Sequence, residues 1–154
     1  MNGRSFILSA LIAGVAIGIF ANLPLFNIIN CFLCIFVWAG GVLAVFLYRA
    51  FQKGGPGLTT GQGAGLVAVS GLIGAFVGIF VNAITNAISA PMLESFIRML
   101  NIQGELPFRS GDLGAIVAST FFFFVFDVIS YPIFGALAGL ITASLTTKKE
   151  VPTA

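Results

Sequence analysis

The feature that most limits the fold of this chain is a long run that is almost without charge. From Leu113 to Thr146 the single charged residue is Asp127. Across all 154 residues, 8% are charged and 58% are hydrophobic, whereas soluble domains carry about 25% charged residues. Side chains of this composition cannot cover a water-exposed surface. The sequence therefore predicts an integral membrane protein that is surrounded mainly by the lipid bilayer.

Four apolar stretches are long enough to cross a bilayer as helices, which takes about 20 residues each. The sequence thus predicts an all-α fold, a polytopic membrane helix bundle that forms one transmembrane domain over residues 1–154. The expected spans lie at about 6–21, 31–51, 64–88 and 115–145.

The basic residues predict the orientation of these spans. In a four-span arrangement, Arg4, Arg49, Lys53 and the pair Lys148–Lys149 all fall on one side. Because Lys and Arg are enriched on the cytoplasmic side of membrane proteins, we expect both termini in the cytoplasm and a location in a bacterial inner (cytoplasmic) membrane. The net charge of +2 gives no reason to expect a nucleic-acid partner.

The loop between the third and fourth spans contains a segment with helical character, "PMLESFIRML". Pro91 suits the first turn of a helix, and Glu94 and Arg98 are spaced for an ion pair on one helix face. The segment predicts a short external helix at about 91–101 that lies in the outer membrane interface. The alternative is a helix packed on the outer end of the bundle.

Two stretches of the chain resemble each other. "SALIAGVAIGIFAN" at residues 9–22 matches "SGLIGAFVGIFVN" at residues 70–82 when one residue is skipped. One interpretation is an internal duplication, which would make two tandem, parallel helical hairpins related by an axis along the membrane normal. The other is a chance match between membrane segments of low complexity.

Glycines recur at four-residue steps in both stretches: Gly14 and Gly18 in the first, Gly74 and Gly78 in the second. Small residues at this spacing form a ridge that lets two helix backbones approach closely. We expect the first and third spans to cross through these glycines, with the asparagine that ends each stretch able to hydrogen-bond across the helices. Packing within one molecule and packing between copies both fit the pattern.

Most enzyme classes find no support in the sequence. The chain has no histidine and its five carboxylates are scattered, so we expect no metal site. The loop "KGGPGLTTGQGAG" lacks the ending of a phosphate-binding loop; we expect a turn in which Thr59 or Thr60 caps the third helix. The sequence contains neither a nucleophile elbow nor a dinucleotide fingerprint, and the expectation is a non-enzymatic protein without a cofactor.

A pair of cysteines raises an alternative to that expectation. In "CFLC", Cys31 and Cys34 lie at the outer end of the second span, and a Cys-x-x-Cys pair at a helix N-terminus is typical of thiol redox proteins. Membrane thiol oxidoreductases that use quinone generally need a second cysteine pair, which this sequence lacks. Two small apolar residues of a helix are the simpler interpretation.

Asp127 raises a further alternative, because an ionisable side chain within a span is a candidate functional site. Its candidate partners are Asn82, Asn86, Ser130 and Tyr131. These residues would form the polar or ion site of a small transporter or channel subunit. Counting about 1.5 Å per residue back from the lysines after the fourth span puts Asp127 near the outer boundary of the bilayer, where its desolvation costs less.

If Asp127 lies at the boundary, the phenylalanine-rich segment before it extends beyond the bilayer core and is not covered by lipid. Residues 113–126 either extend the fourth helix outward or fold back into the outer leaflet; a strongly tilted helix that stays in lipid is the competing picture. The segment is too apolar to stand in water. The external helix, another copy of the chain or a larger membrane complex would cover it.

The middle third of the chain resembles small bacterial multi-span membrane proteins. The likeness consists of Gly-Gly-x-Leu-Ala from Gly40, Leu-Tyr-Arg from Leu47, then a glycine-rich turn and a glycine-rich helix. The resemblance implies a membrane location and no particular activity. Taken together, these features predict a structural or accessory membrane subunit that forms a homo-oligomer or packs in a larger complex.

Overall fold

Helices are the only regular secondary structure in the part of the chain that the structure describes. This computed structural model describes residues 2–23, 34–52, 57–99 and 113–146, without the side chains of residues 86, 87, 89–99, 115 and 116. No strand occurs within those ranges. The predicted all-α fold class is confirmed.

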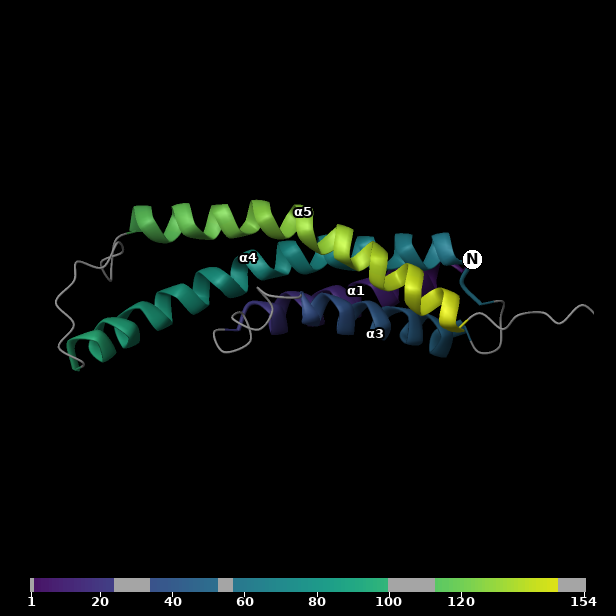
Figure 1. The fold of residues 1–154 in the computed structure, drawn as a ribbon, viewed down its shortest axis with the longest axis horizontal. Helices are drawn as coiled ribbons and strands as arrows, with labels where there is room; N and C mark the ends of the chain where they lie inside the picture. Colours follow the sequence, from purple (N-terminus) through teal and green to yellow (C-terminus); the bar gives the residue numbers. More distant parts are fainter. Residues whose placement is uncertain (1, 24–33, 53–56, 100–112, 147–154) are drawn as a thin grey trace, which may run out of the picture.

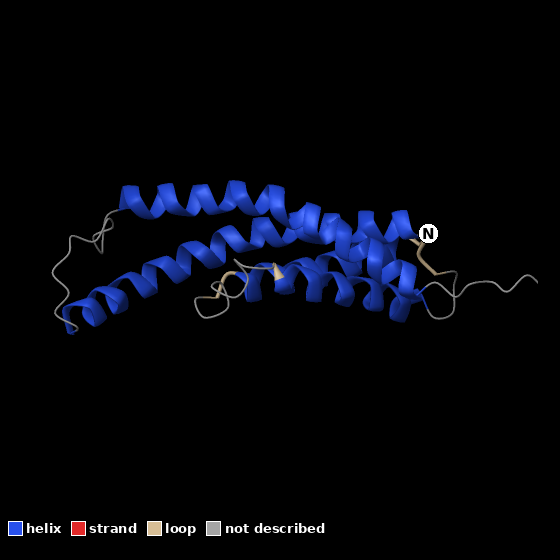
Figure 2. Ribbon diagram, in the orientation of Figure 1, coloured by secondary structure: helices blue, strands red, loops and turns tan. Residues whose placement is uncertain are grey.

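The described residues form four helices: α1 (Gly3–Ala21), α3 (Ile35–Gln52), α4 (Thr60–Met99) and α5 (Leu113–Thr146) (Figure 1). Each contains a segment that is long and apolar enough to cross a membrane. The chain is therefore a multi-pass membrane protein. Figure 2 shows the same view coloured by secondary structure, with the helices packed lengthwise along one another.

Two of these helices begin at polar caps. The side chain of Asn2 accepts a hydrogen bond from the backbone N–H of Arg4 at 3.2 Å. Before α4, Thr59 Oγ1 accepts from the N–H of Gln62 at 3.3 Å, and Gln62 Oε1 accepts from the N–H of Thr59 at 3.1 Å. This reciprocal pair is a capping box, which identifies Thr59 as the cap of the helix.

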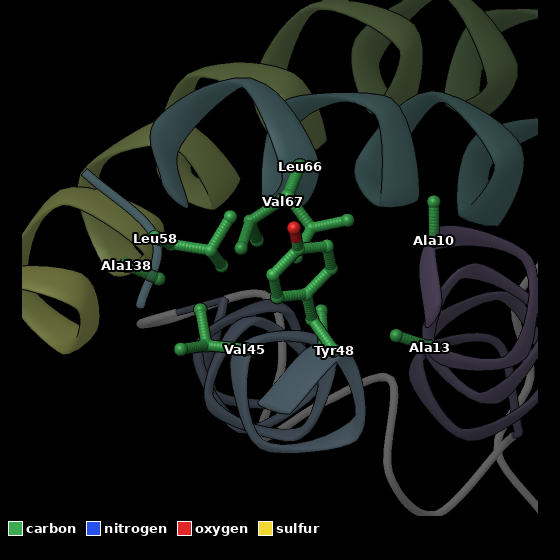
Figure 3. Close-up of a cluster of buried hydrophobic side chains, with 9 residues drawn as sticks. Ala10, Ala13, Val45, Tyr48, Leu58, Leu66, Val67 and Ala138 are labelled. Atoms are coloured by element: carbon green, nitrogen blue, oxygen red, sulfur yellow. The ribbon is translucent and has the colours of Figure 1, made fainter. Parts of the chain in front are cut away.

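α1 and α4 begin at the same end of the molecule and run in the same direction, while α3 and α5 run back toward that end (Figure 1). A cluster of buried side chains fills the space between the helices there (Figure 3). Its largest member is Tyr48, whose hydroxyl accepts a hydrogen bond from the N–H of Asn2 at 3.3 Å. The other members are Ala10, Ala13, Ala44, Val45, Leu58, Leu66, Val67 and Ala138.

The segment that begins at Pro91 is part of α4 and not a separate helix. α4 is continuous from Thr60 to Met99, whereas the sequence suggested an independent external helix at about 91–101. The physical reason is that Pro91 removes only one backbone hydrogen bond, and the sequence has no glycine between Ile88 and Gly104 to end the helix.

α4 and α5 are much longer than the other two helices. At about 1.5 Å per residue, α1 and α3 are about 28 Å long, close to the thickness of a bilayer core, while α5 is about 51 Å and α4 about 60 Å long. Residues 83–99 of α4 and 113–126 of α5 project beyond α1 and α3 (Figure 1). We call this pair of extensions the arm. Because α5 is one continuous helix from Leu113 to Thr146, residues 113–126 do not fold back; the outward extension and the strongly tilted helix within lipid both contain such a helix.

α5 bends part of the way along its length (Figure 1), and it contains Pro132. Proline has no N–H to donate to the carbonyl of Val128 and its ring crowds the preceding turn, which bends a helix. α4 passes this point closely, because a Cβ atom on Gly71 would lie 2.6 Å from the carbonyl oxygen of Tyr131 and 3.0 Å from the nitrogen of Pro132. The bend of α5 is thus packed against a position of α4 that has no side chain.

Candidate functional site

The last turn of α1 ends in a buried asparagine. Asn22 is the C-cap of α1, and its backbone N–H donates to the carbonyl of Ile19 at 3.3 Å. Its side-chain Nδ2 donates to the carbonyl of Gly18 at 3.0 Å. The Asn22 side chain therefore satisfies a carbonyl that the end of the helix would leave without a partner, and it remains buried.

A second asparagine reaches this position from α4. Asn82 is buried, and its Nδ2 donates to Oδ1 of Asn22 at 3.4 Å. The contact is possible because Gly78, one turn earlier on α4, has no side chain: a Cβ atom there would lie 2.5 Å from Nδ2 of Asn22. The hydrogen bond across the helices that the sequence suggested for the two asparagines is present.

Two residues of α5 complete the group. Tyr131 and Asp127 lie four residues apart, so they share one face of the helix, and their side chains are hydrogen-bonded to each other. Tyr131 is also hydrogen-bonded to Asn22. Asn22, Asn82, Asp127 and Tyr131, all buried, form what we call the polar cluster.

The hydrogen bonds of the polar cluster have a direction. With Asp127 ionised, the phenolic O–H of Tyr131 donates to its carboxylate, and the phenolic oxygen accepts from the amide of Asn22. The amide of Asn82 donates to Asn22 in turn. The donors of Asn82, Asn22 and Tyr131 therefore form one chain of hydrogen bonds. This chain runs from α4 through α1 to the carboxyl group on α5.

Cys34 lies beside the polar cluster. It is buried, belongs to the same apolar cluster as Ile17, Ala21 and Tyr131, and has a backbone φ of +47°. Its carbonyl accepts from the N–H of Val37 at 2.9 Å and from that of Trp38 at 3.1 Å, so this turn starts α3. Cys31, the other member of the predicted redox pair, falls outside the described residues.

The charge of Asp127 is not offset by a described cation. Arg4 and Arg49 are the basic residues whose side chains the structure describes, and both lie at the opposite end of the helices. There the guanidinium of Arg49 donates to the carbonyl of Thr146 at the end of α5. Within the described residues no group of three or more His, Cys, Asp or Glu could hold a metal ion. Among the described residues, the group hydrogen-bonded to the Asp127 carboxyl is the hydroxyl of Tyr131.

Of the five residues predicted for the polar site, the structure brings together three: Asp127, Asn82 and Tyr131. The side chain of Asn86 falls outside the description, and Ser130 is buried next to Tyr131 in the chain. Asn22 was not among the residues predicted for this site. The signal was nevertheless present, because Asn22 ends the first copy of the repeated stretch as Asn82 ends the second.

The four predicted packing glycines lie where α1 crosses α4. A Cβ atom on Gly14 would lie 2.7 Å from the carbonyl oxygen of Ser70. One on Gly18 would lie 2.6 Å from that of Gly74. On α4, Gly74 faces the carbonyl of Gly14, and Gly78 leaves room for the end of α1. These contacts hold α1 against α4 and bring the two asparagines of the polar cluster together.

A second glycine seam joins α4 to α5. Gly63 and Gly139 are in backbone contact. A Cβ atom on Gly135 would lie 2.8 Å from the carbonyl oxygen of Val67. The sequence signal for this seam is the Gly-x-x-x-Gly spacing of Gly135 and Gly139.

Compared with protein families, curated proteins and solved structures, the chain matches none of them.

Proposed function

We propose that this protein is a non-enzymatic membrane subunit that assembles with other membrane helices through its arm. The observation that supports this most directly is the length of α4 and α5. A bilayer core about 30 Å thick covers α1 and α3 completely, yet the arm continues beyond them. Tilting α5 until all of it fits would need an angle beyond the usual range of 0–40°.

The surface of the arm supports the same proposal. The outward-facing side chains of its α5 half are large and apolar, and Phe122 is 69% exposed. On the α4 half, Ile84 and Ile88 are both 62% exposed. α4 and α5 also diverge toward the far end of the arm (Figure 1), so they do not fully cover each other. Apolar surface of this extent in contact with water is unfavourable, and a partner would cover it.

A buried hydroxyl group in the arm also supports assembly with another helix. Among the described residues, Thr120 is one of two whose buried side-chain oxygen has no hydrogen-bond partner, and Ser9 is the other. Hydroxyls of this kind form hydrogen bonds between membrane helices. A partner helix that separated α4 from α5 at this point would reach the enclosed oxygen of Thr120.

The predicted redox alternative receives less support from the geometry. Cys34 is buried next to Tyr131, and a reactive thiol is usually partly exposed in an electropositive setting. No described basic side chain lies near it. The burial of Cys34 between helices fits the simpler interpretation, in which it is a small apolar residue of the core.

Site-specific photo-cross-linking tests the assembly. A photo-reactive phenylalanine analogue replaces Phe122 of the arm in one sample and Phe46 of α3 in another, which is 54% exposed. In cells with two differently tagged copies, we expect cross-links from position 122, either to the second copy or to one defined membrane protein. Position 46 should label lipid. Equal cross-linking at the two positions, or none at position 122, would contradict the proposal.

A further inference from the structure

A carboxylate inside a membrane span is unusual unless it has a use, because its charged form loses the hydration that water provides. Asp127 is 9% exposed and belongs to a span. An amide at this position would hold α5 to its neighbours without carrying a charge. We propose that Asp127 is an exchangeable proton-binding site, and that the polar cluster changes the direction of its hydrogen bonds when the proton binds.

The polar cluster suits both charge states of the carboxyl group. With Asp127 ionised, the carboxylate is the final acceptor of the path from Asn82 through Asn22 and Tyr131. A protonated carboxyl group has an O–H and can itself donate, and a tyrosine hydroxyl can donate and accept at once. Asp127 then donates to Tyr131, and Tyr131 donates to Oδ1 of Asn22, which has a second lone pair.

The ligand that this chemistry favours is a proton and not a metal cation. A bound Na⁺ or Ca²⁺ needs several oxygen ligands that point at one position. Here the hydroxyl of Tyr131 donates to Asp127 and Nδ2 of Asn82 donates to Asn22, while Nδ2 of Asn22 donates one N–H to the carbonyl of Gly18 and the other to Tyr131. Donors that face inward would repel a metal cation, whereas a single proton on the carboxylate requires no further ligand.

The position of Asp127 provides a route for the proton. Nineteen residues separate it from Thr146 at the other end of α5, about 28 Å of helix, which is close to the thickness of the bilayer core. With Thr146 at one boundary of the core, Asp127 lies close to the other boundary, on the side where α1 ends. A proton would exchange with that side and not with the side that holds Arg4 and Arg49.

Among the described residues, two titratable groups other than Asp127 itself face the polar cluster. Tyr131 faces it from its own helix, and Cys34 faces the cluster from the start of α3. From α1 and α4 the neighbours are the amides of Asn22 and Asn82, which do not ionise. The proposal does not depend on assembly through the arm, since every group that it uses belongs to one chain.

The two aspartates of the chain allow a direct measurement. The sequence contains Asp112 and Asp127 only, so protein labelled with ¹³C at the aspartate carboxyl carbon and reconstituted in lipid nanodiscs gives two signals. Asp112→Asn and Asp127→Asn assign them. We expect the Asp127 signal to titrate within the pH range in which the protein stays folded, with the same midpoint in NaCl as in KCl. In Tyr131→Phe the midpoint should change, because both charge states of Asp127 lose their hydrogen bond to the Tyr131 hydroxyl.

Trp38 reports on the same event without labelling. It is the only tryptophan of the chain, and it packs against the cluster that contains Tyr131 and Cys34. We expect its fluorescence to change with the midpoint found by NMR. The change should disappear in Asp127→Asn and persist in Cys34→Ala and in Asp112→Asn.

Three results would overturn the proposal. The first is an Asp127 signal in the wild-type protein that stays constant with pH, a measurement that needs no variant to fold. The second is a midpoint that moves with the concentration of Na⁺, which would identify a metal cation as the ligand. The third is a Trp38 transition that remains in Asp127→Asn or is lost in Cys34→Ala.

Discussion

At the scale of single residues, glycine positions control how closely the polar groups approach. Asn22 keeps its amide buried because Gly18 accepts its hydrogen bond and Gly78 leaves it space. A side chain at either glycine would push α1 away from α4. The hydrogen bond between Asn22 and Asn82, already long at 3.4 Å, would then be lost.

Gly18→Ala tests this dependence. The new Cβ atom would lie 2.6 Å from the carbonyl oxygen of Gly74 and 2.6 Å from Cβ of Val77, and neither atom can move without its backbone. We expect the free energy of unfolding to fall by about 1–3 kcal/mol, the usual cost of overpacking, as measured by steric trapping in bicelles. Gly65→Ala is the matched control because no atom lies within 4 Å of its Cβ position. A similar loss in both variants would show that flexibility, and not contact, determines the effect.

The residues also show what a sequence can and cannot predict. The predicted site residues Asp127 and Asn82 were recognisable because polar groups are rare in apolar helices. Asn22 was harder to assign, because a cap at the end of a helix is expected to face water. Its role became visible only when the crossing of α1 and α4 showed where the helix ends meet.

At the scale of the helices, α5 combines a bend with a close contact. Pro132 bends the helix, and the carbonyl of Tyr131 then lies against Gly71 of α4. The apolar run of α5 predicted a long helix and even its outward extension as one of three arrangements. It did not predict that α4 would continue through Pro91, because the same proline is suited to start a helix or to interrupt one.

Gly71→Ala should separate α4 from α5 at the bend. The added Cβ atom would lie within 3.0 Å of three backbone atoms of Tyr131 and Pro132, so the helices must move apart at a cost of about 1–3 kcal/mol. The chain contains two tyrosines, Tyr48 and Tyr131, and fluorotyrosine labelling gives one ¹⁹F signal for each. The Tyr131 signal should shift and the Tyr48 signal should not. If both move equally, the change has spread through the whole bundle.

At the scale of the whole molecule, the helices have two different lengths. A bilayer that matches α1 and α3 is too thin for α4 and α5, and hydrophobic mismatch of this kind favours association between membrane proteins. The thickness of the bilayer therefore determines how much of the arm is covered by lipid.

Bilayer thickness should therefore control the oligomeric state. In vesicles of short-chain phosphatidylcholine we expect oligomers, because each arm needs protein to cover it. In long-chain phosphatidylcholine the lipid covers more of the arm and the monomer fraction should rise. Single-molecule photobleaching counts the subunits in each case. Association that is independent of chain length would show that the exposed length of the arm does not drive it.

The parallel crossing of α1 and α4 has a consequence for how the chain holds together. Each hairpin starts at the same end of the molecule, so two such hairpins could meet face to face even as separate polypeptides. The segment between Gln52 and Thr60 then acts as a tether that raises the effective concentration of one half for the other. Asn22 of one hairpin and Asn82 of the other are hydrogen-bonded at the contact between the two halves. If the chain were cut in the tether, the two fragments should therefore still bind each other.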